Sequence, residues 1–292
     1  MAGFDYRQPL DLEEASALLV EGGEDAVAVG GGSVVFALVR ERIFRPEVVV
    51  DLQKIPELRF LEADAAGLMI GAMTTLSEIE RSPAVLAQYP YLAEVVAKVA
   101  SRRLRNQITL GGCLAYGETA SDPPAACLVL DASVHTGRKG GGRTIEVKDL
   151  FVDRYETCLE RGELIREISV PPIKANSRFG HHKFTPRSRA DKPTLGIAVR
   201  LDLAPGGGGC EDARVAFSNA APRPVRSPGA EEALRAGPLE EATFRAAAEA
   251  AAAEADPPDD VYCSGDYKRE MVKVLLPRLL RRMTNGDSAG AG

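Results

Sequence analysis

The sequence lacks the cysteine and histidine patterns that hold metals or build common catalytic sites. Its cysteines are widely spaced and never form a C-x-x-C pair, which argues against a disulfide framework, a zinc site and an iron–sulfur cluster on this chain. The three histidines are too scattered to indicate a catalytic triad or a metal centre. The residues concerned are Cys113, Cys127, Cys158, Cys210, Cys263, His135, His181 and His182.

Long apolar runs and large basic clusters are also missing. No apolar run approaches the roughly 18 residues of a membrane span, and the first residues show no basic-then-apolar signal pattern, so we expect a cytoplasmic protein. The formal net charge of −6 argues against a nucleic-acid surface. The one basic cluster, Arg102, Arg103 and Arg105, is interpreted as a helix end.

The 292 residues, 45% of them hydrophobic, are enough for two or three domains with their own cores. We expect a helix over 9–21, a strand, turn, helix and strand over 26–52, and a helix beginning after Thr75, where Glu78 completes a capping box. Further along, two strands flank a glycine-rich hairpin loop at 205–209. An alanine-rich helix over 231–255 and a last helix over 265–283 follow.

The most distinctive stretch is the glycine turn Gly30, Gly31, Gly32 and Ser33, between an apolar run and a helical pattern. Consecutive glycines allow positive φ and remove every Cβ, so a phosphate can approach several N–H groups at a helix start. We therefore interpret this turn as a phosphate cradle, and we expect valine at Gly31 to abolish ligand binding with the fold largely retained.

A second glycine feature, Gly111–Gly112, is weaker evidence because a lone glycine pair is more typical of a turn or bulge. Both glycine features have hydroxyl and amide side chains nearby. Two such turns fit the two ends of one extended ligand.

Two other interpretations of the first turn remain to be weighed. A dinucleotide-binding Rossmann unit would use Asp51, about twenty residues further on, for a ribose, but Val35 stands where its third glycine belongs. A Walker lysine before Ser33 is missing too. Alternatively, the glycines serve packing alone.

Taken together, the motifs resemble the FAD-binding medium subunit of molybdenum hydroxylases, the family of aerobic carbon monoxide dehydrogenase and xanthine dehydrogenase. The resemblance covers nearly the whole chain, in order. The motifs are AVAVGGGSVVFALVRERIFRPEVVVDLQKIPEL, GAMTTLSEIE, RNQITLGGCLAYGETASDPPAACLVLDA, FVDRYETCLERGELIREISVPP and CSGDYKREMVKVLLPRLL.

The resemblance implies an α+β fold. Its FAD-binding part is vanillyl-alcohol-oxidase-like (PCMH-type), with two subdomains over 1–60 and 61–172. A C-terminal domain over 173–286, with a three-stranded antiparallel sheet and helices, would follow, and then a disordered tail over 287–292.

The resemblance also assigns cofactor contacts. Val29 to Val34, that is Val29, Gly30, Gly31, Gly32, Ser33 and Val34, would wrap the FAD pyrophosphate. Thr109, Gly111, Gly112 and the following Cys113 would form the second cradle. Asp122 would hold ribityl or ribose hydroxyls, Thr74 would lie beside the cofactor, Leu164 and Ile165 would pack near the isoalloxazine, and Lys183 would face the polar edge of the flavin. Cys113, Gly117–Glu118–Thr119 and Asp153 depart from the usual family pattern.

The implied function is electron transfer. In the resembled complexes FAD receives electrons from [2Fe-2S] clusters on a small subunit, a large subunit holds the molybdenum cofactor, and the assembly is a dimer of heterotrimers. We expect FAD to be bound without a covalent link and this chain to carry no substrate chemistry of its own. The alternatives are a self-sufficient FAD-dependent oxidoreductase of the same fold and a nucleotide-binding module without redox work.

Overall fold

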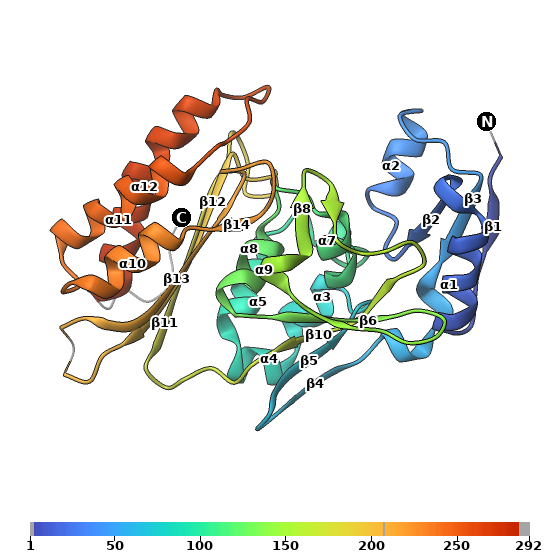
Figure 1. Ribbon diagram of the computed structural model, residues 1–292, viewed down its shortest axis with the longest axis horizontal. Coiled ribbons are helices and arrows are strands. Elements are labelled where there is room, and N and C mark those ends of the chain that lie inside the picture. Colours follow the sequence, from blue (N-terminus) through green and yellow to red (C-terminus); the bar gives the residue numbers. More distant parts are fainter. Residues whose placement is uncertain (1–2, 207, 286–292) are drawn as a thin grey trace. The chain divides into compact units, whose positions relative to one another are not determined.

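The computed structural model describes residues 3–206 and 208–285 (Figure 1). The chain forms two compact units, and it passes between them repeatedly. The first unit comprises Met1–Tyr116, Ala132–Leu150 and Thr157–Pro171, and the second comprises Gly117–Asp131, Phe151–Glu156 and Pro172–Gly292. Within the described ranges, no helix is both long and apolar enough to cross a membrane.

The first unit begins with a small parallel sheet in the order β1-β3-β2. Its elements are β1 (Asp5–Arg7), α1 (Leu12–Glu21), η1 (Gly23–Asp25), β2 (Ala26–Val29), α2 (Val35–Arg40) and β3 (Val48–Asp51). Asp11 caps α1 by accepting a hydrogen bond from the backbone N–H of Glu14 at 2.8 Å. The apolar face of α1 packs against β3 and the residues that follow it. The sequence analysis predicted α1, β2, α2 and β3 but missed β1.

A five-stranded antiparallel sheet forms the rest of the first unit, in the order β4-β5-β10-β6-β7. The strands are β4 (Leu61–Asp64), β5 (Gly67–Gly71), β6 (Ser133–Gly137), β7 (Thr144–Glu146) and β10 (Leu164–Val170). Helices and turns of this unit are η2 (Leu52–Lys54), η3 (Pro56–Leu58), α3 (Leu76–Arg81), α4 (Pro83–Gln88), α5 (Pro90–Ala97), α6 (Arg102–Arg105), α7 (Leu110–Tyr116) and α9 (Val147–Leu150). The predicted capping box is confirmed, because Thr75 and Glu78 exchange side-chain and backbone hydrogen bonds at the start of α3.

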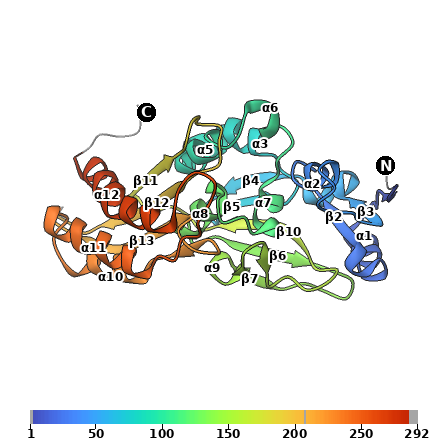
Figure 2. The ribbon, with the colours of Figure 1, turned by 90° about the horizontal axis from the view of Figure 1, so that it is seen from above.

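The second unit is built on an antiparallel sheet in the order β11-β12-β13-β14 (Figure 1), and Figure 2 shows its first three strands from above. The strands are β11 (Ser177–Phe184), β12 (Leu195–Leu203), β13 (Cys210–Ser218) and β14 (Val225–Arg226), and the helices are α8 (Asp122–Val129), α10 (Pro228–Ala236), α11 (Glu241–Glu254) and α12 (Gly265–Thr284). A separate hairpin, β8 (Phe151–Asp153) and β9 (Glu156–Thr157), lies where the chain crosses between units.

The two faces of this second sheet carry different helices. Alternate residues of β12, among them Ile197 and Val199, join the apolar core formed with α10, α11 and α12. The opposite face meets α8: Arg200 donates a hydrogen bond to the carbonyl oxygen of Val129 at 3.1 Å, and Ser218 donates one to that of Ser121 at 2.9 Å. The second unit is therefore a sheet covered on both faces.

Some sequence-based expectations need correction here. The single helix expected over 231–255 is wrong, because α10 ends at Ala236 and α11 begins at Glu241, with Pro238 in the break. Proline has no N–H to continue a helix, which accounts for the interruption. The antiparallel sheet also has a short fourth strand, β14, beyond the three expected. The domain boundaries at 60/61 and 172/173 stay predictions, and the tail 287–292 lies outside the described residues.

Candidate FAD site

The first glycine turn connects β2 to α2 and lies against another loop of the same unit. A Cβ built on Gly31 would lie 1.6 Å from the carbonyl oxygen of Gln107, and one on Gly30 would lie 3.0 Å from Oγ1 of Thr109. Gly32 has a φ of +67°. Packing therefore requires glycine at 31 and backbone geometry favours it at 32. The expectation that valine at Gly31 would spare the fold is wrong, because the new side chain would overlap backbone atoms.

The same turn presents unpaired backbone donors. Within residues 3–206 and 208–285, the N–H groups of Gly31, Gly32, Ser33 and Val34 donate no hydrogen bond, although all four residues are partly exposed. Since these donors are partly exposed, an acceptor from outside the chain, either water or a ligand, can satisfy them, and several N–H groups in a row form the kind of concavity that binds anions. A phosphate fits this arrangement, as the sequence analysis proposed.

The second glycine segment is not a turn but the first part of helix α7. Its N–H groups already have acceptors: Gly111 donates to the carbonyl oxygen of Ala72 at 3.1 Å, Gly112 to Oγ1 of Thr109 at 3.1 Å, and Cys113 to the carbonyl oxygen of Thr109 at 3.0 Å. A Cβ on Gly111 would lie 2.6 Å from that of Ala72. The glycine pair therefore supplies no free N–H donors. Gly111 allows close packing on Ala72, and Gly112 is exposed.

The structure nevertheless places the two glycine segments side by side. Thr109 precedes α7, contacts Gly30, and pairs with Thr75 in an isolated antiparallel bridge. One ligand lying on the Gly31–Val34 donors would therefore have Thr109 and Gly112 within the same part of the surface. The contacts of Thr109, Gly111, Gly112 and Cys113 with the cofactor stay predictions.

Three other predicted contacts are buried in the first unit. The Thr74 hydroxyl donates to the carbonyl oxygen of Phe60 at 2.7 Å, and Thr74 is only 2% exposed. Leu164 and Ile165 lie in β10 at 6% and 5% exposure, and Leu164 belongs to the core around α1. Their roles near the cofactor stay predictions.

Burial raises the pKa of the Cys113 thiol to about 12, so Cys113 is protonated at neutral pH.

The glutamate of the GELI motif has a structural role that the sequence analysis did not predict. Glu163 is 5% exposed and accepts hydrogen bonds from Arg143 Nε at 2.8 Å and from the Thr136 hydroxyl at 2.7 Å. These bonds fasten the β6–β7 hairpin to the start of β10. Burial alone would raise the pKa of Glu163, but the hydrogen bonds from Arg143, the Glu160 N–H and Thr136 lower it to about 2.

Asp122 and Lys183, both predicted cofactor contacts, meet in the second unit. The Asp122 carboxylate lies 3.2 Å from Lys183 Nζ and 3.2 Å from His181 Nε2. The Asp122 and His181 side chains are each 1% exposed. Burial opposes the charge on Asp122, yet the hydrogen bonds and charges of His181 and Lys183 hold its pKa below the usual range. The sequence analysis missed His181, although residues 181 and 183 share a face of β11 once that strand is recognised.

The surroundings of Asp51 argue against its proposed role as the ribose ligand of a Rossmann unit. This residue is 1% exposed, and its carboxylate accepts hydrogen bonds from the Tyr6 hydroxyl, from Gln8 Nε2 at 3.0 Å and from the Gln53 N–H at 3.0 Å. These bonds use three of the roughly four acceptor sites of the carboxylate, and its burial leaves little access for a ribose hydroxyl. The parallel sheet moreover has only three strands within the described residues.

Comparison with known proteins identifies the families of both parts of the chain. Residues 2–173 match the family model described as FAD binding domain in molybdopterin dehydrogenase, and residues 181–283 match the CO dehydrogenase flavoprotein C-terminal domain. The chain is 32% identical to the carbon monoxide dehydrogenase medium chain of Hydrogenophaga pseudoflava, covering 95% of this chain and 96% of that one. It is 33% identical to the nicotine 6-hydroxylase medium subunit of Paenarthrobacter nicotinovorans, covering 94% and 95%.

Similarity in three dimensions is equally extensive. A solved structure of carbon monoxide dehydrogenase from Hydrogenophaga pseudoflava, which lacks the Mo-pyranopterin moiety of its cofactor, matches with a TM-score of 0.92. That match has 34% identity and covers 96% of each chain. These findings confirm the PCMH-type fold expected from the sequence. The chain belongs to the family of FAD-binding medium subunits of molybdenum hydroxylases, and it is an oxidoreductase flavoprotein.

Proposed function

We propose that this chain carries FAD in a molybdenum hydroxylase complex and passes electrons from [2Fe-2S] clusters on a partner subunit to an external acceptor. The observation that carries the proposal is the row of four unpaired N–H groups from Gly31 to Val34 in a chain that belongs to an FAD-binding family. A pyrophosphate is the part of FAD that such a row of donors recognises.

The residues present fit this cofactor. The Gly31–Val34 donors would bind the pyrophosphate, and the absence of a Cβ at Gly31 lets the turn that carries them pack against the carbonyl oxygen of Gln107. Thr109 and Gly112 would lie near the same turn. The cofactor contacts of Asp122 and Lys183, whose side chains are buried and bound to each other, stay predictions. FAD, when bound, supplies the redox chemistry that links single-electron donors to acceptors of one or two electrons.

The partners are proposed from the relatives. These are a carbon monoxide dehydrogenase medium chain and a nicotine 6-hydroxylase medium subunit, each of which is one chain of a larger enzyme. We propose an iron–sulfur small subunit and a molybdenum-cofactor large subunit as the partners of this chain, in a dimer of heterotrimers. A cytoplasmic location, expected from the sequence, is part of the same proposal, and fractionation of the native host tests it.

Two measurements on the purified chain test the cofactor. We expect a yellow protein with a flavin spectrum, from which acid or heat releases all the flavin into the supernatant. Flavin that stays on the precipitated polypeptide would contradict noncovalent binding. A colourless chain that takes up no added FAD would contradict the proposal as a whole.

Coexpression with the neighbouring genes tests the electron-transfer role. We expect the isolated chain to show no flavin reduction by an organic substrate, and the complex with an iron–sulfur and a molybdenum subunit to show it. If the chain elutes alone and its flavin is reduced by a substrate directly, the self-sufficient oxidoreductase replaces the subunit function.

A further inference from the structure

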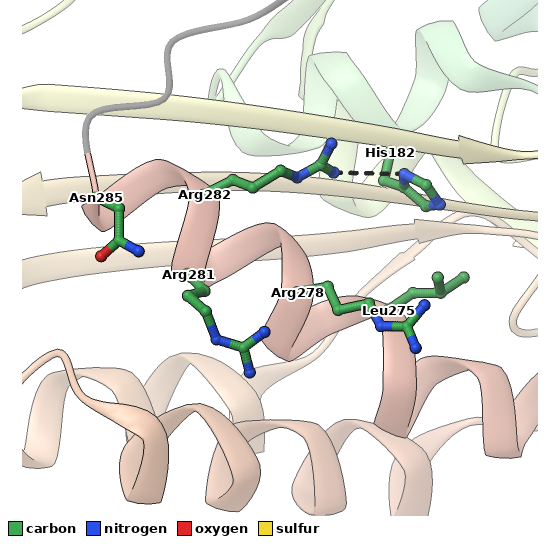
Figure 3. A pocket seen from close by; sticks show the side chains of 6 residues that line it. All are labelled: His182, Leu275, Arg278, Arg281, Arg282 and Asn285. Atoms are coloured by element: carbon green, nitrogen blue, oxygen red, sulfur yellow. Dashed lines mark hydrogen bonds between the residues drawn. The ribbon is translucent and has the colours of Figure 1, made fainter. Parts of the chain in front are cut away.

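A pocket in the second unit, apart from the residues assigned to FAD, is lined by cationic side chains. Its volume is about 460 Å³, and it lies between β11 and the C-terminal part of α12. Figure 3 shows its lining residues, which are His182, Leu275, Arg278, Arg281, Arg282 and Asn285. None of the six carries a negative charge.

Three arginines reach this pocket because of helical spacing. Positions 278, 281 and 282 of α12 are three and four residues apart, so they lie on one side of the helix. Arg282 extends toward His182, with its Nη2 3.4 Å from Nδ1 of that ring (Figure 3). The three guanidinium groups are exposed, so water weakens their mutual repulsion, and a bound anion would reduce it further.

The compensation inside the chain is incomplete. Arg281 pairs with Glu241 at 2.7 Å. Over residues 3–206 and 208–285, Arg278 makes no ion pair or hydrogen bond, and Arg282 has only its contact with His182. Elsewhere in the same unit arginines are well paired: Arg200, Arg214 and Arg226 all lie within 3.4 Å of the Asp131 carboxylate.

The end of the helix does not account for all three arginines. The partial negative charge at a helix C-terminus favours cations only within about the last turn. Arg281 and Arg282 lie in that turn, but Arg278 is more than one turn before the end of α12 at Thr284. An anion from outside the chain would satisfy Arg278 and Arg282 together.

We propose that this pocket binds a phosphate-bearing small molecule through Arg278 and Arg282. Arginine is suited to phosphate because its planar fork donates two parallel hydrogen bonds to two oxygens. Leu275 also lines the pocket but is only 6% exposed and belongs to the core of this unit, so the site would hold its ligand chiefly through charge. The site differs from the Gly31–Val34 donors, which belong to the first unit.

Calorimetric titration of the FAD-saturated full chain with pyrophosphate and with ADP tests this site. Saturation with FAD fills the glycine turn, so heat from added pyrophosphate reports on another site. We expect saturable binding of one molecule per chain, weakened about tenfold or more by R278A and by R282A, because each removes charge-assisted hydrogen bonds. R103A, which removes an exposed arginine of α6 in the first unit, should bind as the unchanged chain does.

Two outcomes would overturn the proposal. One is the absence of saturable heat with either probe at low ionic strength. The other is an equal dissociation constant for the unchanged chain, R278A and R282A, provided that each variant keeps its flavin and its unfolding midpoint. Loss of binding in R103A as well would show a general charge effect rather than a pocket. Flavin content is measured in every sample, so displacement of FAD by pyrophosphate is recognised directly.

Discussion

Asp122 at the start of α8 and Lys183 in β11 form a buried ion pair, with 3.2 Å between carboxylate and ammonium. The pair joins residues 61 positions apart in the sequence, and His181 completes it from the same strand. Asp122 thus has a role in holding α8 against the sheet, in addition to its proposed contact with the cofactor.

This pair gives the first prediction. Asp122→Asn leaves the buried Lys183 ammonium without its carboxylate, so we expect the free energy of unfolding of the FAD-free chain to fall by about 3–5 kcal/mol. Asp122→Asn combined with Lys183→Met should recover part of that loss. Urea unfolding measures both. An FAD dissociation constant that rises equally in the two variants would show a direct cofactor contact, whereas an unchanged constant would restrict Asp122 to the ion pair.

The second prediction concerns the approach of Gly31 to Gln107. Gly31→Ala introduces a Cβ 1.6 Å from a carbonyl oxygen, so the two loops must separate, at a cost of more than about 3 kcal/mol in unfolding free energy. Flavin content should fall as well. Gly208→Ala is the matched control, because its Cβ meets nothing within 4 Å. Equal unfolding midpoints for the two variants would show that the loops move apart without cost.

The third prediction is a pH dependence. The pKa of Glu163 is about 2 in the folded chain, below its ordinary value of 4.5, so folding favours the charged form. The contribution of this charge to the free energy of unfolding is complete above pH 4.5 and is lost as pH falls toward 2. Because Arg143 is half exposed, water screens its interaction with Glu163. We therefore expect the ionised Glu163 to contribute only about 1–3 kcal/mol to the free energy of unfolding.

Glu163→Gln tests this dependence. The difference in unfolding free energy between the unchanged chain and this variant should be largest near pH 7 and should shrink between pH 5 and pH 2. Glu62→Gln, on an exposed position of β4 in the same sheet, should show no such trend. A difference that is constant with pH would rule out the titration of Glu163 as its source.

The fourth prediction concerns Asp131, which follows α8 with a φ of +50° and contacts three arginines. Asp131→Asn keeps a side chain that tolerates this backbone conformation but removes the charge, so we expect a loss of about 2–3 kcal/mol in unfolding free energy. Asp153→Asn, at an exposed position, is the control. Flavin affinity should stay the same in both, and loss of FAD from Asp131→Asn alone would extend the cofactor site to the residues that follow the C-terminal end of α8.

Local signals made part of this structure predictable from sequence. The Thr75–Glu78 capping box, the glycine turn after Val29 and the pairing of β12 with β13 each depend on residues close together in the chain, and all three occur where they were expected. The same turn supplies the free donors of the candidate site. Its need for glycine at 31 was not predictable, because the clashing atom belongs to Gln107.

Other elements lacked a clear local signal. The strand β11, SRFGHHKF, is polar and has no regular alternation, so no strand was expected from its own sequence pattern. Helix α8 begins with two prolines, which are tolerated in a first helical turn but resemble a loop in the sequence. Because neither element was predicted, the contact of Asp122 with His181 and Lys183 could not be predicted from the sequence. It depends on packing between segments far apart in the chain.

The membership of α8 in the second unit affects how the chain is made. Every residue of α8 is buried, yet the helix is complete at Val129, and the strand β13 that covers it ends at Ser218. At roughly 5–20 residues per second, a ribosome needs about 4–18 s to synthesise the intervening segment. During that time the apolar residues of α8 have no sheet to pack against. We therefore expect chaperones that bind nascent chains to bind this protein at α8, before the C-terminal strands have been synthesised.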